Sequence, residues 1–512
     1  MPELQRLQVP LFRVQTEQLI PLASPLEFYL AVLRGIKESR QRITLSTLYL
    51  GNGQMERHLV TQLREASDRN PYLKVRVVLD YNRGMRRHRG ESSMELLLEA
   101  KMKAKKPNNL DFVLYRHSYC PQMLDPLIHT GLPEVGGTYH SKACVFDDSV
   151  ILTGANLSEE YFLTRKDRYL LVDRAPELAD HLDDFFEVFA DHGDRIGRER
   201  AVERAHLTSA RRSTQARRSL DLFFLNSAEI ARERRAAPTP AALDGAGPRR
   251  LTARSLPAES QSTLVAQFKA SRSPLETLEV VSRAEELGAE RQPSPSTGGS
   301  VHIAVAFQVP QMGLRQEEEL FAKTMEILGA QPGRKSATLV SCYFNPTHTL
   351  RSSFAALPTE ARLAFVAGSP RGSSFYRAGT FKKNIPLVYR ESLYRWIQAF
   401  AAREDARFFE YFQEKTSFHV KGFWAEVENN EQRDYLTIIG SSNYSMRSFS
   451  RDLEGQFYIF TSDPEAIDKL DLDRQSVMHH AEETTAASLK RDPDTTPGLW
   501  SSLLYSLFKR FI

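Results

Sequence analysis

The sequence predicts an α/β protein made of two similar halves joined by an irregular connection. Helix-like stretches alternate with short apolar runs in both halves, a pattern typical of layered α/β domains. The order of these runs is alike in the two halves, which indicates an internal duplication. Each half also carries a His-x-Lys strand, followed by a small-residue turn that ends in Asn.

Apolar periodicity places the elements of each half. The first half is predicted to contain helix 25–40, strands 43–49 and 73–79, helix 92–103, strand 111–115 and a His-x-Lys strand that runs on through 150–152. The second half is predicted to contain helix 317–328, strands 337–343 and 363–367, helix 387–403, strand 407–411 and the second His-x-Lys strand.

Two segments between the halves read as linker. Residues 236–263 are rich in Ala, Pro, Arg and Ser, and residues 292–300 form a Pro/Ser/Gly run. Such compositions favour linkers or poorly ordered insertions, although 264–291 is predicted to be helical in parts. The predicted boundaries are therefore 1–205 for the first domain, 206–300 for the connecting segment, 301–490 for the second domain and 491–512 for a terminal helix.

Composition narrows the class of protein. The chain has 512 residues, of which 41% are hydrophobic and 26% charged, as in ordinary globular proteins. Its three cysteines form no pattern, which favours free thiols in a reducing compartment. No run approaches the roughly 20 apolar residues that span a bilayer. Residues 1–18 resemble neither a secretory signal nor a transit peptide.

The C-terminal stretch 499–512 pairs apolar residues at helical spacing, with Ser, Lys and Arg opposite. We expect a helix too short to cross a bilayer, because at ~1.5 Å per residue it reaches only about 21 Å. A helix lying in the surface of an anionic membrane and a helix docked on the protein itself both remain open, and the terminal position favours the membrane. The residues predicted to enter the membrane are Trp500, Leu503, Leu504, Leu507, Phe508 and Phe511.

The paired His-x-Lys strands carry the chemistry. Residues i and i+2 of a strand share a face, so His140 projects with Lys142, and His419 with Lys421. Two such strands that face each other across a pseudo-twofold axis would gather two imidazoles and two ammonium groups around one phosphate. One imidazole attacks phosphorus while the other protonates the leaving group. The lysines supply the positive charge, so no metal is required.

Further polar residues recur at matching distances after each lysine. Asp147 and Glu426 each stand five residues beyond it, and both turns end in Asn, at Asn156 and Asn443. These amides are candidate donors to phosphate oxygens. Asp167 and Glu454 follow eleven residues after the asparagines, where a carboxylate would hold a histidine Nδ1–H and leave Nε2 to face phosphorus. All these residues are assigned to the catalytic site.

The paired H-x-K-x4-D pattern resembles the phospholipase D superfamily over roughly residues 25–205 and 300–465, with Glu426 replacing the family's Asp. The resemblance implies two tandem phospholipase D-like domains, each a mixed sheet flanked by helices. Within the superfamily the chain looks most like eukaryotic phosphatidylglycerophosphate synthases. The segments that carry this likeness are 46–53, 149–158, Asp167-Arg168-Tyr169, 418–422, 451–454 and the C-terminal stretch.

That closer likeness implies transfer of a phosphatidyl group from CDP-diacylglycerol to sn-glycerol 3-phosphate, with release of CMP. It also implies cardiolipin biosynthesis at the mitochondrial inner membrane, with the protein peripheral to an anionic surface and no nucleic-acid partner. In this scheme His140 attacks phosphorus and His419 moves the proton, or the reverse. Whether divalent cations stimulate the enzyme by screening lipid charge stays open, as do oligomeric state and acyl preference.

Several residues are candidates for substrate binding, each with an ordinary structural alternative. The loop Gly51-Asn52-Gly53 could admit a nucleotide phosphate, but a tight turn also explains its glycines. Arg83, in the arginine-rich loop 83–89, could hold a substrate phosphate or be solvated. Tyr49 and Tyr343, which end corresponding strands, could line the cleft or belong to the core.

Two rival functions are carried forward. One is another enzyme of the same chemistry: a phospholipase, a cardiolipin or phosphatidylserine synthase, or a nuclease. The other is a non-catalytic membrane scaffold. Both His-x-Lys pairs and both asparagines are present, which argues against the scaffold.

Overall fold

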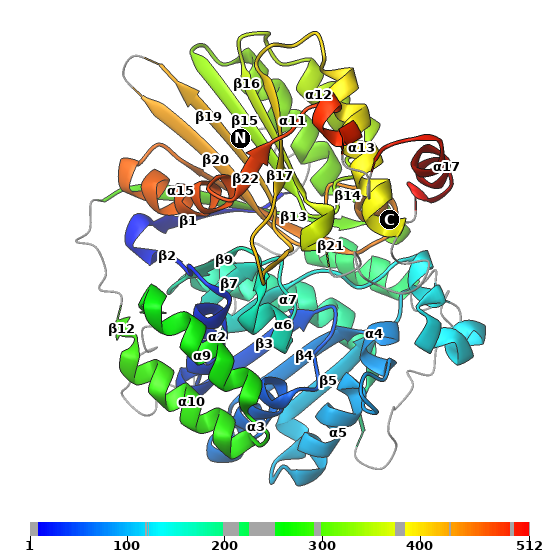
Figure 1. Ribbon diagram of the computed structural model, residues 1–512. Coiled ribbons are helices and arrows are strands. Elements are labelled where there is room, and N and C mark those ends of the chain that lie inside the picture. The colour runs from blue at the N-terminus through cyan, green and yellow to red at the C-terminus, as the bar shows by residue number, and fades with distance from the viewer. Residues whose placement is uncertain are drawn as a thin grey trace. The chain divides into compact units, whose positions relative to one another are not determined.

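A computed structural model describes residues 9–117, 120, 122–197, 214–224, 251–290, 298–373, 384–429, 432–491 and 496–510. The chain divides into two compact units (Figure 1). The first unit comprises Glu17–Thr164 and Tyr169–Pro295, and the second comprises Met1–Thr16, Arg165–Arg168 and Ser296–Ile512. Each is a mixed sheet flanked by helices, so the predicted α/β class is confirmed.

The sheet of the first unit has the strand order β10-β5-β4-β3-β6-β7-β9-β2. β3, β4 and β5 run parallel, and every other neighbouring pair is antiparallel. The strands are β2 (Leu19–Pro21), β3 (Arg42–Thr47), β4 (Lys74–Asp80), β5 (Leu110–Tyr115), β6 (Ala143–Phe146), β7 (Ser149–Thr153), β9 (Tyr169–Val172) and β10 (Asp194–Arg195).

The second unit repeats this topology. Its sheet runs β1-β13-β21-β20-β19-β15-β16-β17-β22, again with a parallel trio, β15, β16 and β17, among antiparallel neighbours. The matching order and directions confirm the predicted duplication. The strands are β1 (Leu11–Gln15), β13 (Ser300–Val309), β15 (Arg334–Ser341), β16 (Arg362–Gly368), β17 (Ala406–Tyr411), β19 (Lys421–Glu428), β20 (Arg433–Gly440), β21 (Glu454–Thr461) and β22 (Ala481–Glu483), with β14 (Leu314–Arg315) beside β13.

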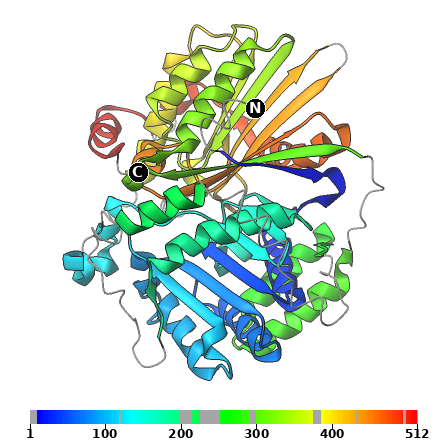
Figure 2. The ribbon, with the colours of Figure 1, turned by 180° about the vertical axis from the view of Figure 1, so that it is seen from behind.

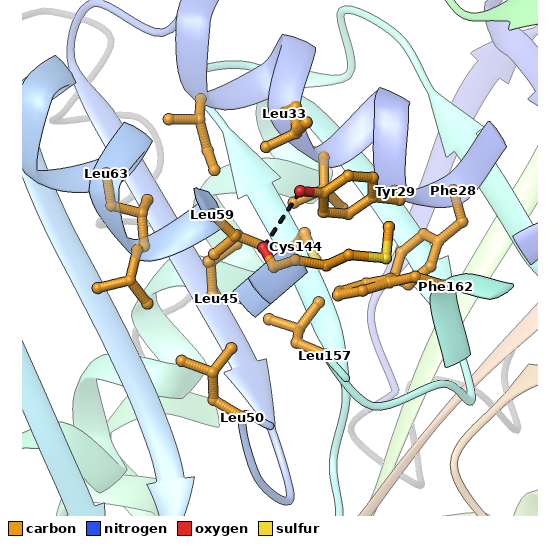
Figure 3. Packing of buried hydrophobic residues seen from close by; sticks show 14 of the residues in the cluster. Phe28, Tyr29, Leu33, Leu45, Leu50, Leu59, Leu63, Cys144, Leu157 and Phe162 are labelled. Atoms are coloured by element: carbon orange, nitrogen blue, oxygen red, sulfur yellow. Dashed lines mark hydrogen bonds between the residues drawn. The ribbon is translucent and has the colours of Figure 1, made fainter. Parts of the chain in front are cut away.

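Helices cover both faces of the first sheet. α2 (Pro25–Glu38) and α3 (Gln54–Arg69) bury their apolar sides in one core (Figure 3), to which α5 (Ser93–Lys103) also contributes. α7 (Pro176–Asp191) lies across the opposite face (Figure 2). α2 begins where the Ser24 side chain accepts the N–H of Glu27 and Pro25 opens the first turn. Its Tyr29 donates a hydrogen bond to the Met55 carbonyl in α3 across 3.1 Å, which ties the two helices together.

Residues predicted to connect the domains are partly built into the first unit. α9 (Ala258–Ala270) and α10 (Pro274–Leu287) bury apolar side chains in its core, and α10 packs on α3. The predicted boundary at 205 therefore differs from the observed unit, because α10 packs on α3 and α9 packs on α10. Residues 206–213, 225–250 and 291–297 of the predicted connecting segment lie outside the described residues.

Two short segments belong to the second unit although their sequence neighbours do not. β1 pairs antiparallel with β13, and Thr16 donates a hydrogen bond to Asp463 across 2.8 Å. β8 (Arg165–Lys166) pairs with β18 (Ser417–Phe418) beside the second His-x-Lys motif. The predicted domain 1–205 kept both segments with the first half, because a sequence cannot show which free strand edge will be used.

The helices of the second unit are α11 (Gln316–Ala330), α12 (His348–Ala355), α13 (Ile385–Ala399), α15 (Pro464–Met478) and α17 (Leu499–Phe508). An aromatic core fixes the first three to the sheet, with Trp396 of α13 in edge contact with Phe365 of β16 at 5.2 Å. No helix within the described residues is long and apolar enough to span a bilayer. Shorter elements are α4 (Tyr81–Met85), α6 (Glu159–Leu163), α14 (Met446–Ser450), α16 (Ala486–Arg491), β11 (Arg254–Ser255), β12 (Ala289–Glu290) and the 3-10 turns between 16 and 18, 107 and 109, 122 and 136, 310 and 312, and 370 and 372.

The C-terminal helix α17 packs on α13 with one face (Figure 1). Ser501 donates to Glu391 across 2.9 Å, Arg395 donates to Ser502 across 2.6 Å, and Leu504 is buried beside them. Four apolar side chains on the other side are more than half exposed: Leu499 (94%), Trp500 (57%), Leu503 (51%) and Leu507 (58%). Leu504 therefore faces the protein, contrary to its predicted membrane role, while Phe511 lies outside the described residues.

Candidate active site

The second His-x-Lys motif lies where β18 passes into β19. His419 and Lys421 are both buried, and the Lys421 ammonium donates a hydrogen bond to the His419 carbonyl across 2.7 Å. Lys421 Nζ also lies 3.2 Å from His419 Nε2. The i, i+2 geometry of the strand thus places a positive charge directly beside the imidazole, where it can also reach an oxygen bound to phosphorus.

Asp167 holds the other nitrogen of His419. Its Oδ2 lies 2.7 Å from Nδ1, and Lys421 Nζ lies 3.8 Å from the same oxygen and 2.6 Å from Nδ1. An ionised carboxylate only accepts hydrogen bonds, and an ammonium only donates them. A hydrogen on Nδ1 is donated to Asp167 and leaves the Nε2 lone pair for chemistry, while the ammonium has its acceptor in the His419 carbonyl oxygen.

Arg168 anchors the segment that carries Asp167. Its guanidinium donates to the Ile438 carbonyl across 2.6 Å and to the Thr437 hydroxyl across 2.9 Å, and its central carbon lies 4.2 Å from the Trp424 ring centre. Arg168 thereby fixes Asp167 against the second unit. Sequence reasoning gave Arg168 no role, although its position beside a predicted catalytic carboxylate was the available signal.

The turn after β20 carries the second asparagine. Ser341 donates to the Asn443 carbonyl across 3.0 Å, and the Cys342 thiol lies 3.5 Å from Asn443 Oδ1. Glu454 accepts a hydrogen bond from Ser441 in this turn and is fully buried. Burial, and then the charge of Glu454, raise the pKa of the neighbouring Glu317 well above its ordinary value. Within the second unit, Asp167 rather than Glu454 is the carboxylate on His419.

The first unit repeats the same local pattern. Lys142 is 1% exposed, and its ammonium donates to the His140 carbonyl across 2.5 Å, as Lys421 does to His419. Asn156 donates to the Tyr161 hydroxyl across 2.9 Å and accepts from Thr47 across 3.3 Å. The two duplicated units have therefore kept the same hydrogen bond from the lysine ammonium to the histidine carbonyl oxygen.

Asp147 and Glu426 lie at the far ends of their strands. Five residues at ~3.3 Å each place them about 16 Å from the lysines. Asp147 accepts the backbone N–H groups of Arg40, Gln41 and Arg42 at 2.8, 2.8 and 3.0 Å, while Glu426 pairs with Arg433 at 2.6 Å. Both carboxylates, predicted as catalytic, hold strand ends together in the structure instead of approaching the histidines.

The arginine-rich loop of the first unit meets acidic partners. Arg83 lies 3.6 Å from Glu134 and 4.6 Å from the Tyr49 ring centre. Arg86 pairs with the same Glu134, and Arg87 pairs with Glu95. The protein's own carboxylates therefore already offset the positive charge of these guanidinium groups, which a substrate phosphate would need as its partner. Tyr49 and Arg83 stack on each other.

The predicted nucleotide loop wraps a buried carboxylate. The Glu56 side chain accepts the N–H of Glu159, and burial raises the pKa of Glu56 to about 7. A Cβ on Gly51 would lie 2.0 Å from a Glu56 oxygen, which explains the glycine. Asn52 donates to the carbonyl oxygens of His88 and Glu91, the second across 2.9 Å. This geometry is that of a tight structural turn.

Tyr343 lies beside the reactive histidine. Its ring meets that of His419 edge-on, with ring centres 5.8 Å apart at 86°, and it stands 5.3 Å from the ring centre of Tyr389. Among the described residues there is no group of three or more His, Cys, Asp and Glu side chains placed to hold a metal ion. The lysine ammonium groups place positive charge beside both histidines.

A model of a known protein family matches most of the sheet-forming part of the first unit. Residues 32–189 match the family model described as cardiolipin synthase, PLD-like domain. The domain contains His140, Lys142 and Asn156, so the resemblance predicted from the motifs is confirmed.

Curated relatives extend the likeness over nearly the whole chain. Those named CDP-diacylglycerol–glycerol-3-phosphate 3-phosphatidyltransferase include the mitochondrial proteins of Gallus gallus and Homo sapiens, 28% and 26% identical. The alignments cover 98% of this chain and 85% and 84% of those proteins. The relative from Schizosaccharomyces pombe is 27% identical, with 98% of this chain and 95% of that protein covered.

A solved structure shares the fold from end to end. Phosphatidylserine synthase from Haemophilus influenzae Rd KW20 superposes with a TM-score of 0.67 at 17% identity, covering 99% of this chain and 98% of that one. The two-unit α/β fold is thus that of a known phospholipid enzyme.

Proposed function

We propose that this protein transfers the phosphatidyl group of CDP-diacylglycerol to sn-glycerol 3-phosphate, giving phosphatidylglycerophosphate and CMP. The observation that carries the chemistry is the Asp167–His419–Lys421 arrangement: an oriented imidazole beside a fixed cation. The names of relatives that align over 98% of this chain support the choice of donor and acceptor.

In the first step, His140 Nε2 attacks the phosphorus that bears the diacylglycerol. A P–N bond forms while the P–O bond to CMP breaks, and His419 gives a proton to the departing CMP oxygen. The buried Asp167 carboxylate 2.7 Å from Nδ1 stabilises the imidazolium that must exist before this transfer, which favours His419 for the acid–base role. The ammonium groups of Lys142 and Lys421 offset the negative charge that grows on the phosphoryl oxygens.

In the second step, the 1-hydroxyl of sn-glycerol 3-phosphate attacks the phosphatidyl-histidine. His419, now neutral, takes the hydroxyl proton as the new P–O bond forms and the P–N bond to His140 breaks. Both histidines return to their starting protonation states, so the cycle closes without a metal-bound nucleophile or an external proton source.

We further propose that the protein is a peripheral protein of the mitochondrial inner membrane and works at the anionic surface of that membrane. The exposed Trp500, Leu503 and Leu507 on α17 form the apolar contact, and Lys509 and Arg510 follow the helix as partners for lipid phosphates. The mitochondrial relatives support the compartment.

The function is tested by incubating the protein, on vesicles containing labelled CDP-diacylglycerol, with and without sn-glycerol 3-phosphate. We expect CMP release and labelled phosphatidylglycerophosphate only when the acceptor is present. Phosphatidate formed from water would instead identify a hydrolase. Serine and phosphatidylglycerol as alternative acceptors test the phosphatidylserine synthase and cardiolipin synthase alternatives in the same assay.

A further inference from the structure

A loop with an exposed apolar face precedes the first His-x-Lys motif. It consists of two 3-10 turns, η3 (Gln122–Thr130) and η4 (Leu132–Gly136), drawn in cyan at the edge of the first unit beside α4 (Figure 1). Three of its large apolar side chains are exposed to solvent: Met123 by 82%, Leu127 by 37% and Leu132 by 53%. Neighbouring apolar side chains that stay exposed in this way mark a surface that contacts a partner.

Arginines of the first unit hold the loop in this form. The buried Arg116 donates to both carboxylate oxygens of Asp125, across 2.6 and 3.0 Å. Arg86 donates to the Ile128 carbonyl across 3.3 Å and pairs with Glu134. Asp125 and Glu134 are the acidic residues of the 122–136 loop, and both side chains are mostly buried by these contacts. The loop is therefore fixed at its base, and its negative charges are offset by arginines.

The duplicated units show that this loop is an addition to the shared fold. β5 and β17 are the third strands of the two parallel trios, and each is followed by its His-x-Lys motif. Residues 116–139 join β5 to His140, whereas the shorter stretch 412–418 joins β17 to His419. The sheet can thus be built with the shorter connection, so the 122–136 loop serves a purpose other than closing the fold.

We propose that the 122–136 loop inserts into the surface of an anionic phospholipid bilayer and holds the first unit on the membrane that carries CDP-diacylglycerol. This inference rests on the proposed transferase function and adds a second membrane contact to that of α17. The three exposed apolar side chains enter the boundary between headgroups and acyl chains, and the exposed Arg87 and Arg89 meet lipid phosphates.

The charges next to the loop favour an anionic lipid surface as its partner. Arg87 and Arg89 follow Arg86 in the chain, and both are exposed, although Arg87 also pairs with Glu95. An apolar surface beside exposed guanidinium groups matches a bilayer, in which acyl chains lie directly beneath a layer of phosphates. A second protein with only an apolar surface would leave these arginines without a complementary charge.

The position of the loop in the chain connects this contact to catalysis. At no more than ~3.6 Å per residue, the chain from Gly136 at the end of η4 to His140 spans at most about 14 Å. A bilayer held by the loop therefore brings its headgroup phosphates near the histidine that accepts the phosphatidyl group in the proposed reaction.

A fluorescent label tests the contact directly. The three native cysteines are buried, so Met123→Cys provides a single exposed thiol for an environment-sensitive nitrobenzoxadiazole label. On vesicles containing phosphatidylglycerol, we expect the emission of this label to rise and shift to shorter wavelength, and lipids spin-labelled in their acyl chains to quench it. Tyr72→Cys is the matched control, because the exposed Tyr72 precedes β4, at the opposite end of the parallel strands. Its label should keep the emission that it has in buffer.

Steady-state kinetics test the purpose of the contact. The combined variant Met123→Ser, Leu127→Ser and Leu132→Ser should raise the KM for CDP-diacylglycerol in vesicles at least about tenfold, because it removes the apolar contact with the bilayer. With a short-chain CDP-diacylglycerol below its critical micelle concentration, the same variant should keep kcat/KM within about twofold of wild type, because no membrane surface is involved. The soluble substrate also shows whether the variant is folded.

The outcomes separate this inference from the proposed function. A label at residue 123 that does not respond to vesicles which the protein binds overturns the loop contact and leaves the transferase reaction intact. Equal responses from the labels at 123 and 72 overturn it as well. So does a change in emission without vesicles that grows with protein concentration, because the loop then contacts a second copy of the chain. Wild-type protein that makes no product from the soluble donor and sn-glycerol 3-phosphate rejects the function itself.

Discussion

Replacing Asp167 by Asn is expected to impair turnover far more than substrate binding. Asp167 contacts His419 Nδ1 at 2.7 Å, and the exposed fractions of the two side chains are only 1% and 4%. An asparagine amide can donate to Nδ1, which moves the ring hydrogen to Nε2 and removes the lone pair that must take the acceptor's proton. It also removes the charge that stabilises the imidazolium.

The size of the effect follows from these two losses. A hydrogen bond to a charged group contributes about 1.5–3 kcal/mol, so the lost charge alone lowers the rate roughly 10- to 150-fold. Little of this is screened, because both groups are buried. The tautomer change adds to it, and in the serine protease triad the same exchange lowers kcat by about 10⁴. We expect kcat of Asp167→Asn to fall about 10²- to 10⁴-fold.

The assay is CMP release from CDP-diacylglycerol vesicles at saturating acceptor, with KM measured for both substrates. A positioning role predicts a loss in kcat with both KM values nearly unchanged, whereas simple unfolding would lower the amount of active protein. Asp473→Asn is the matched control, because Asp473 pairs with the neighbouring Arg168 at 3.2 Å and does not touch His419. Its kcat should stay within about threefold of wild type, as for most partly exposed ion pairs.

The reasoning would be refuted if Asp167→Asn kept a tenth or more of the wild-type kcat while folding normally. Equal losses in Asp167→Asn and Asp473→Asn would also contradict it, since they would point to a general loosening of the segment 165–168.

Three further predictions concern stability, pH and membrane binding. Asp147→Ala leaves three backbone N–H groups without their acceptor, so it should destabilise the first unit by about 2–4 kcal/mol in urea unfolding. Glu426→Gln weakens one partly exposed ion pair and should destabilise the protein by less than about 1 kcal/mol. Burial lowers the pKa of His58 from 6.5 to about 4, so the unfolded chain binds a proton before the folded protein does as the pH falls. The free energy of unfolding should therefore decrease between pH 6.5 and pH 4, by up to about 3 kcal/mol. His58→Gln should remove that part of the slope of unfolding free energy against pH, and an unchanged slope would exclude His58 as its source. Trp500→Ala combined with Leu503→Ser and Leu507→Ser should lower binding to anionic vesicles at least about tenfold in a sedimentation assay. Leu472→Ser, which changes an exposed leucine on α15, is the control. Equal binding by all variants would reject α17 as the membrane contact.

Local pattern predicted much of this protein. The strand period alone placed Lys142 and Lys421 beside their histidines, and a fixed spacing from Asn156 indicated Asp167 as a histidine partner. The 3.6-residue period likewise predicted an amphipathic tail helix, although not that Leu504 would face α13. These features depend on residues close together in the chain.

The features that the sequence did not predict depend on which strand edges, far apart in the chain, pair with each other. β1 joins β13, and β8 joins β18, because those strand edges offer unpaired backbone groups, and nothing in the local sequence specifies the choice. The structural role of Asp147 became visible only when the backbone of residues 40–42 was found around it.

The covalent intermediate provides the most direct test of the proposed mechanism. The protein is mixed with CDP-diacylglycerol labelled at the phosphatidyl phosphorus, without acceptor, and denatured in neutral detergent within the first turnover; peptides are then mapped by mass spectrometry. The proposed mechanism predicts an acid-labile phosphatidyl group on His140, absent in His140→Ala and discharged when sn-glycerol 3-phosphate is added. Product formation at the normal rate with no labelled histidine at any time would contradict it.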